Sequence, residues 1–348
     1  MVSLAIHCAS MIRGRLAAVI LGAVAAASCR ATPHKSTSNG VPLLADVLIP
    51  ASTTMVTAWD IPQDPLAEKS LDDSRLSKDI RWGYKLFTDT PHEAKQYAPG
   101  RMSCSNCHLN AGQRERSLPL VGVAGMFPEY NRRSGRLYSL NDRIVDCFWR
   151  SENGTGVLEE TGLAPRGSHD AHGSSGPESR ASSEMLPSPT SKEVLAIAAY
   201  LTWLARGTAM GKNPTWRGQN TIAPSALIPV GQLDRRRGED IFKERCTNCH
   251  GLDGQGVAVG DKKPGPLWGP NSWNDGAGAA RIYTLAGMIR YSMPYLDPGN
   301  ITDADAQHVA AFIDSKPRPA FPFKDRDYRV EKLPPDAIYY TRQVSLSR

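Results

Sequence analysis

The spacing of apolar side chains predicts helices at two distant places in the chain. Residues 194–201 and 306–313 both carry apolar side chains at the period of an amphipathic helix. Each segment is preceded, well upstream, by a shorter one that is a plausible first helix, at residues 83–87 and 238–242. The pattern therefore indicates a weak twofold repeat of small, mainly helical units.

Stretches rich in proline, serine and glycine separate these helices and predict where regular structure is interrupted. Residues 30–70 contain five prolines and are typical of a tether, whereas residues 154–189 lack any periodicity and are typical of an inserted loop. The predicted organisation starts with a tether (29–70) and a first domain (71–206) that contains the inserted loop (154–189). A linker (207–233), a second domain (234–317) and an extended tail (318–348) follow.

The amino terminus has the pattern of a secretory signal. An apolar run at residues 16–27 follows two arginines and is too short to span a bilayer, so residues 1–28 are predicted to be a signal peptide. Cys29 follows in a setting that resembles a lipoprotein cleavage site, and ordinary cleavage near Ala27 is the alternative. We expect an exported, periplasmic protein, anchored to the membrane if Cys29 is lipidated.

The net charge of the chain argues against nucleic acid as a partner. The formal net charge is +6, and removal of residues 1–28 takes away two arginines and no acid, which leaves +4. This balance is too mild to suggest binding to nucleic acid.

Two Cys-x-x-Cys-His motifs, one in each half of the repeat, carry the clearest chemical signal. In such a motif the two thiols attach a haem c covalently and the histidine binds its iron. A zinc site would need four ligands brought together, and a redox pair would not need the histidine. We expect two haem c groups, held by Cys104, Cys107, His108, Cys246, Cys249 and His250. With the helix order above, this predicts a mainly α fold of two tandem class I cytochrome c domains, each wrapped around one covalently bound haem c.

Each iron needs a second ligand from farther along the chain. In the second half, Met293 lies 43 residues after His250, and its rival Met288 falls in a helical core pattern. The first half has no methionine at that distance, but Cys147 lies 39 residues after His108. The matching offsets suggest that Cys147 binds the first iron as a thiolate, the alternative being a buried, inert cysteine.

Arginines surround Cys147 in the sequence. Five arginines and two acids lie between residues 131 and 151. If residues 141–151 are helical, Arg143, Cys147 and Ser151 share one face, with Arg150 beside it. Guanidinium groups suit oxyanions, so the pattern favours either a pocket for a small dianion or a basic face that docks an acidic electron-transfer partner.

Taken together, these residues resemble the thiosulfate dehydrogenase family of dihaem c-type cytochromes. The resemblance covers residues 75–320, and its motifs lie at residues 103–112, 143–154 and 266–294. It implies an oxidoreductase that joins two thiosulfates into tetrathionate, or runs the reverse, and passes electrons to a small acceptor such as a single-haem cytochrome c. The alternatives are a non-catalytic dihaem electron-transfer protein or subunit, and a haem-based sensor.

The resemblance also implies roles for particular residues. Cys147 would be the axial thiolate of the catalytic haem, and Arg133, Arg143 and Ser151 would match the substrate-pocket residues. Departures from the family pattern are the longer insert, a glutamate at 152 in place of methionine, and a serine at 292 where some members have lysine.

Overall fold

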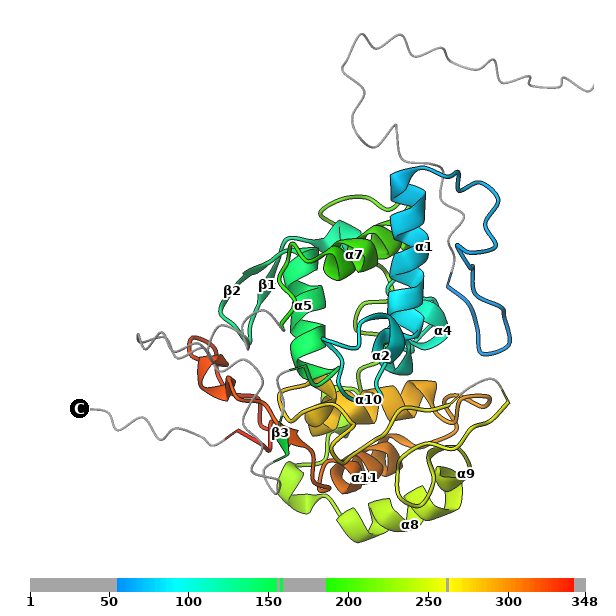
Figure 1. Cartoon of the computed structure of the whole chain (residues 1–348). Helices are drawn as coiled ribbons and strands as arrows, with labels where there is room; N and C mark the ends of the chain where they lie inside the picture. Colours follow the sequence, from blue (N-terminus) through cyan, green and yellow to red (C-terminus); the bar gives the residue numbers. More distant parts are fainter. Residues whose placement is uncertain (1–54, 155–156, 159–185, 261–262, 341–348) are drawn as a thin grey trace, which may run out of the picture. The chain divides into compact units, whose positions relative to one another are not determined.

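The computed structural model describes residues 55–154, 157–158, 186–260 and 263–340 (Figure 1). These residues belong to one compact unit, Leu44–Arg348. The predicted signal peptide, Cys29 and most of the predicted insert lie outside the described residues. None of the helices in the described part of the chain is long and apolar enough to cross a membrane.

In the first half, α1 (Arg75–Thr88) packs against α7 (Lys192–Leu204), and α5 (Leu140–Arg150) packs against α7 as well. The α1–α7 contact is close because α1 has glycine at position 83. A Cβ atom at Gly83 would lie only 1.9 Å from the carbonyl oxygen of Ala196, so any side chain there would separate the two helices.

The second half repeats this contact. Here α8 (Arg235–Arg245) packs against α11 (Asp303–Ile313), which also contacts α10 (Ile282–Ser292). A Cβ atom at Gly238 would lie 2.0 Å from the carbonyl oxygen of His308. The four helical segments predicted from the sequence fall within α1, α7, α8 and α11, so the mainly helical prediction is confirmed.

Short elements connect these helices. The single-turn helices are α2 (Thr90–Glu93), α3 (Cys104–Cys107), α4 (Leu109–Gly112) and α9 (Thr247–His250). The 3-10 helices are η2 (Val123–Met126), η4 (Pro224–Ala226), η5 (Val230–Gln232), η6 (Gly278–Ala280) and η7 (Lys324–Arg326). The strands are β1 (Glu129–Asn131), β2 (Arg136–Tyr138), β3 (Val157–Leu158) and β4 (Pro319–Ala320).

The four strands of the described residues form two antiparallel pairs. β1 and β2 make a hairpin just before α5, with Tyr130 opposite Leu137. β3 and β4 are far apart in sequence, and Val157 pairs with Ala320. The second pair fixes the start of the C-terminal segment beside the residues that follow α5.

Two hydrophobic clusters form the core, one in each half. The first includes Phe87 and Tyr200, and the second includes Phe242 and Phe312. The buried Tyr200 hydroxyl donates a hydrogen bond to the carbonyl oxygen of Ala111 at 2.7 Å, which ties α7 to the chain that follows the first Cys-x-x-Cys-His motif.

Candidate functional site

The first Cys-x-x-Cys-His motif presents two thiols and one imidazole. α3 contains both cysteines, and His108 follows it directly. His108 Nδ1 lies 2.6 Å from the carbonyl oxygen of Leu118, which leaves Nε2 for a metal. Leu118 has a φ of 51°, a left-handed conformation that costs a branched residue about 1–2 kcal/mol. The fold thus accepts backbone strain where it orients the histidine.

The second motif has a similar donor set with a different hydrogen-bond environment. Cys246 precedes α9, which contains Cys249 and His250. His250 Nδ1 is buried and has no hydrogen-bond partner among the described residues. Burial lowers the pKa of His108 and of His250 to about 4, so both imidazoles are neutral at physiological pH, the form that binds a metal.

These donors fit covalently attached haem. The five cysteines in the described part of the chain are all free, and four of them belong to the two motifs. Among the described residues, no group of three or more His, Cys, Asp or Glu side chains is placed to hold a metal ion, so the zinc alternative has no ligand cluster there. Two thiols and one neutral imidazole per motif are the groups that bind haem c.

Cys147 lies on α5, near the first motif. The helix begins at Ser139, whose backbone N–H donates to Asp142 Oδ2 at 2.9 Å while the Asp142 N–H donates to Ser139 Oγ at 3.1 Å. Burial raises the pKa of the Cys107 thiol to about 12, with smaller contributions from the charges of Glu152 and Cys147. The structure therefore brings Cys147 and the first motif into one electrostatic environment.

Arg143 lies beside Cys147. Its side chain is 46% exposed, and its Nη1 atom lies 3.2 Å from Asp146 Oδ2. Burial raises the pKa of the Cys147 thiol, and the charge of Arg143 is the largest opposing influence, with a smaller one from Arg133. A thiol in this setting stays protonated near neutral pH, so a thiolate here requires a bound metal.

Arg133 and Ser151 complete the residues predicted for the substrate pocket. Arg133 Nη1 donates to the carbonyl oxygen of Gly276, and its own carbonyl accepts from the Tyr328 N–H at 2.7 Å. Ser151 caps the end of α5, where its N–H donates to the Cys147 carbonyl oxygen at 2.8 Å. Arg133 and Arg143 thus both act electrostatically on Cys147, and Ser151 follows it by one helical turn.

Glu152, the residue that departs from the family pattern, is buried. It is 2% exposed, and burial raises its pKa to about 8. Its Oε2 atom has no hydrogen-bond partner among the described residues. The carboxyl group is therefore mostly protonated at neutral pH and adds little negative charge to a site for anions.

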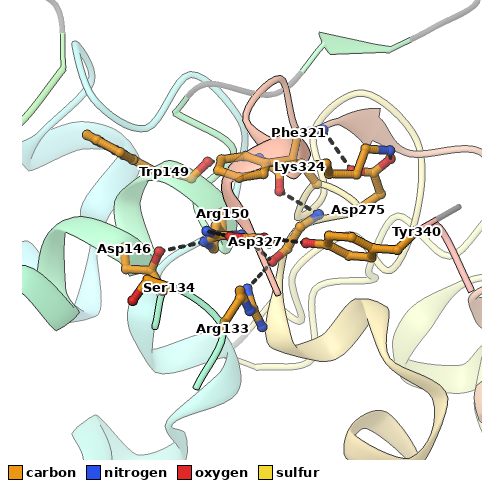
Figure 2. Close-up of polar contacts among 12 residues, drawn as sticks. Arg133, Ser134, Asp146, Trp149, Arg150, Asp275, Phe321, Lys324, Asp327 and Tyr340 are labelled. Atoms are coloured by element: carbon orange, nitrogen blue, oxygen red, sulfur yellow. Dashed lines mark hydrogen bonds and ion pairs between the residues drawn. The ribbon is translucent and has the colours of Figure 1, made fainter. Parts of the chain in front are cut away.

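Arg150, which the sequence placed beside the Cys147 face, is instead the centre of a buried ion-pair network (Figure 2). Its Nη1 and Nη2 atoms lie 2.7 and 2.8 Å from the two carboxylate oxygens of Asp327, and its Nε atom lies 2.5 Å from Asp146 Oδ1. Burial alone would lower the pKa of Arg150, but these two carboxylates outweigh it and raise the pKa. Arg150 therefore supplies no free charge for a ligand.

The C-terminal segment supplies much of this network (Figure 2). Asp327 accepts a hydrogen bond from the Tyr340 hydroxyl at 2.5 Å, and the Phe321 ring centroid lies 4.0 Å from the Arg150 guanidinium carbon. Lys324 pairs with Asp275 at 2.5 Å. No chemical role was predicted for this tail from the sequence, and no local pattern reveals one, because the partners of the tail lie on α5 and in the second half.

Met293 follows α10 as its cap residue. It is partly buried and packs against the hydrophobic cluster of the second half, as does Cys246. Its rival Met288 lies within α10, as the helical pattern predicted. Met293 therefore lies at the carboxyl end of α10, whereas Met288 lies inside this helix.

Comparisons with known proteins show which proteins this chain is similar to. Residues 234–313 match the family model described as cytochrome c oxidase, cbb3-type, subunit III. Thiosulfate dehydrogenase of Stutzerimonas stutzeri is 34% identical over 259 residues, which cover 74% of this chain and 73% of that protein. Thiosulfate dehydrogenase of Allochromatium vinosum is 33% identical, over 72% of this chain and 82% of that protein.

A solved structure is also similar. It is thiosulfate dehydrogenase (TsdBA) from Marichromatium purpuratum in its as-isolated form, with a TM-score of 0.58 and 29% identity. The match covers 72% of this chain, which spans about half (48%) of that longer chain.

Proposed function

Because this chain belongs to the thiosulfate dehydrogenase family, we propose that it couples two thiosulfates to one tetrathionate, or catalyses the reverse, at the Cys147 face of α5. The observation that carries this proposal is the position of Arg143 one helical turn before the partly buried Cys147 on α5, where the charges of Arg143 and Arg133 both oppose the rise in the pKa of the Cys147 thiol.

We propose two haem c groups, one for each of two tandem class I cytochrome c domains. His108 and Cys147 would bind the first iron, and His250 and Met293 the second. The repeated α1–α7 and α8–α11 contacts support two equivalent haem domains. The match of residues 234–313 to a cytochrome subunit supports an electron-transfer role for the second half.

The reaction needs positive charge more than it needs acid or base. Two thiosulfate dianions lose two electrons in total, one sulfur–sulfur bond forms, and tetrathionate carries the remaining two negative charges. The bound haems supply the places to which those electrons go. Arg143 is half exposed, and no carboxylate of the described residues lies within ion-pair distance of Arg133, so both can offset repulsion between the dianions.

The two proximal histidines differ in a way that favours electron flow toward the second half. The hydrogen bond from His108 to Leu118 makes that imidazole a more basic ligand, which stabilises oxidised iron. His250 has no such partner among the described residues. Together with a thiolate in the first site and a thioether in the second, this favours electrons moving from the Cys147 site toward Met293 and on to a small acceptor protein.

Haem stoichiometry provides the first test. The purified protein is expected to carry two covalent haems, because each motif provides its own thiols. Cys104→Ala with Cys107→Ala, and separately Cys246→Ala with Cys249→Ala, should each leave one, as measured by haem absorbance per mole of chain after denaturation. Cys147→Ala is the matched control and should retain both. A wild-type protein with a single haem would contradict the proposal.

The substrate assay tests the reaction itself. Anaerobic mixing with thiosulfate should reduce the haems and yield tetrathionate. Arg143→Gln is expected to raise the KM for thiosulfate about tenfold, because one charge-assisted contact to a dianion is lost. Arg136→Gln is the matched control, since that exposed arginine lies before α5 and pairs with Asp142. Haems that remain oxidised in thiosulfate, yet exchange electrons with a small cytochrome, would favour a non-catalytic electron-transfer protein.

The proposed setting is the periplasm. Covalent haem attachment by Cys-x-x-Cys-His motifs and the signal-like amino terminus support export. Lipid attachment at Cys29 would hold the protein at the membrane surface.

A further inference from the structure

Residues 110–116, which follow the first Cys-x-x-Cys-His motif, form hydrogen bonds with residues 292–295, the loop that contains Met293. Ser292 is fully buried and donates from Oγ to the carbonyl oxygen of Arg116 at 3.2 Å. On the other side of Met293, the Tyr295 hydroxyl donates to Asn110 Oδ1. The chain is therefore fixed one residue before and two residues after Met293.

Arg114 makes two further contacts with this loop. Its side chain is 1% exposed, and its Nη2 atom donates to the carbonyl oxygen of Tyr295 at 2.5 Å. The guanidinium carbon also lies 4.4 Å from the centroid of the Tyr295 ring, a cation–π distance. Its backbone is fixed in turn by a bridge to Val56. A long side chain is thus held rigidly in a contact between residues 181 positions apart.

Arg114 forms no ion pair with a described residue. No carboxylate of the described residues lies within ion-pair distance of it, and its Nη1 atom is buried with no hydrogen-bond partner among them. A buried, unpaired guanidinium is costly, so its retention calls for an explanation.

We propose that Arg114 is a positioning residue that clamps the Met293 loop and so keeps Met293 on the second iron in both oxidation states. This inference rests on the proposed function only for the assignment of Met293 as ligand. It adds a role for the first half of the chain: that half sets the ligation and the potential of the haem in the second half.

Two physical effects of Arg114 act in the same direction. The contacts with Tyr295 restrict the loop, which favours the ligated state of Met293, and a methionine ligand raises the potential of a haem. The positive charge of Arg114 disfavours the ferric form, which carries one more positive charge than the ferrous form. Loss of Arg114 should therefore lower the potential of the second haem.

The experiment uses the haem-loaded full chain. Ferric haem with a methionine ligand has a weak long-wavelength absorption band, and added imidazole removes this band as it displaces the methionine. In Arg114→Gln, the band should disappear at about tenfold lower imidazole than in wild type, because a charge-assisted hydrogen bond and a cation–π contact are lost. The second midpoint potential should fall, while the spectrum of the first haem stays unchanged.

Two control variants distinguish the loss of the Arg114–Tyr295 contacts from the loss of a positive charge. Arg116→Gln removes an exposed charge two residues away but keeps the backbone carbonyl that accepts from Ser292, so it should behave as wild type. Arg114→Lys keeps the charge without the planar guanidinium, so it should respond to imidazole as Arg114→Gln does but lose less potential. If Arg114→Gln and Arg116→Gln match in both measurements, the clamp is wrong. A wild-type protein without the band would overturn the assignment of Met293, whatever the thiosulfate assay shows.

Discussion

Replacement of Cys147 by methionine is expected to lower the rate of thiosulfate-dependent haem reduction by about 100- to 1,000-fold. The substitution keeps a sulfur atom of similar reach on α5 but removes the group that can become a thiolate. It should also disturb the charge balance with Arg143, which is the largest influence that favours the ionised form of Cys147. Stopped-flow absorbance with thiosulfate as the only reductant gives the rate.

Two further measurements make this result interpretable. Cys147→Met should still carry two covalent haems, because Cys147 is not part of either attachment motif. Its second haem should still accept electrons from a small-molecule reductant. If the variant turned over thiosulfate at the wild-type rate, Cys147 would have no part in the reaction.

Asp327→Asn is expected to lower the free energy of unfolding by about 3–5 kcal/mol, because it leaves the buried Arg150 charge with only one carboxylate partner. The Arg150 side chain is 7% exposed and the Asp327 side chain 2%, so solvent cannot compensate. Urea unfolding of the haem-loaded protein, followed by tryptophan fluorescence, measures the effect.

Asp325→Asn is the matched control for this stability measurement. Asp325 pairs with Arg329, and both side chains are about two-thirds exposed, at 67% and 65%. Exposed pairs contribute about 0–1 kcal/mol, so this variant should unfold close to wild type. Equal effects of the two substitutions would mean that burial of the Arg150–Asp327 pair has no special importance.

The sequence predicted the repeated helices well because their signals are local. Apolar spacing located the closing helices of both halves, and Gly83 and Gly238 occupy equivalent positions where a close helix contact excludes a side chain. The Cys-x-x-Cys-His motifs are also local, and each folds into a short helical turn that ends near its histidine. Spacing within a few residues was sufficient in each case.

The interactions that the sequence missed join distant positions. Arg150 and Asp327 are 177 residues apart, so helical periodicity placed Arg150 beside Cys147 without revealing its actual partners. Arg114 and Tyr295 are separated by 181 residues and belong to no recognisable motif. Periodicity gives the angular position of a side chain on its own helix, but which groups that helix faces depends on tertiary packing.

Burial also changes the charge expected for one residue, Glu152. Glu152 looked like an added negative charge near a site for anions. Because burial raises the pKa of its carboxyl group to about 8, the group is largely neutral at the pH where the sequence counts it as charged. Composition cannot give this result, since it depends on the environment of the side chain.

The 177 positions that separate Arg150 from Asp327 have a consequence for biosynthesis. Translation proceeds from the amino terminus, so α5 is complete before the second carboxylate partner of Arg150 has been made. The buried network around Arg150 can therefore be completed only after residue 327 has been added. The first half is consequently not a transferable module: a gene fragment that ends before residue 318 would encode both Cys147 and the first motif but would leave Arg150 with Asp146 and without Asp327.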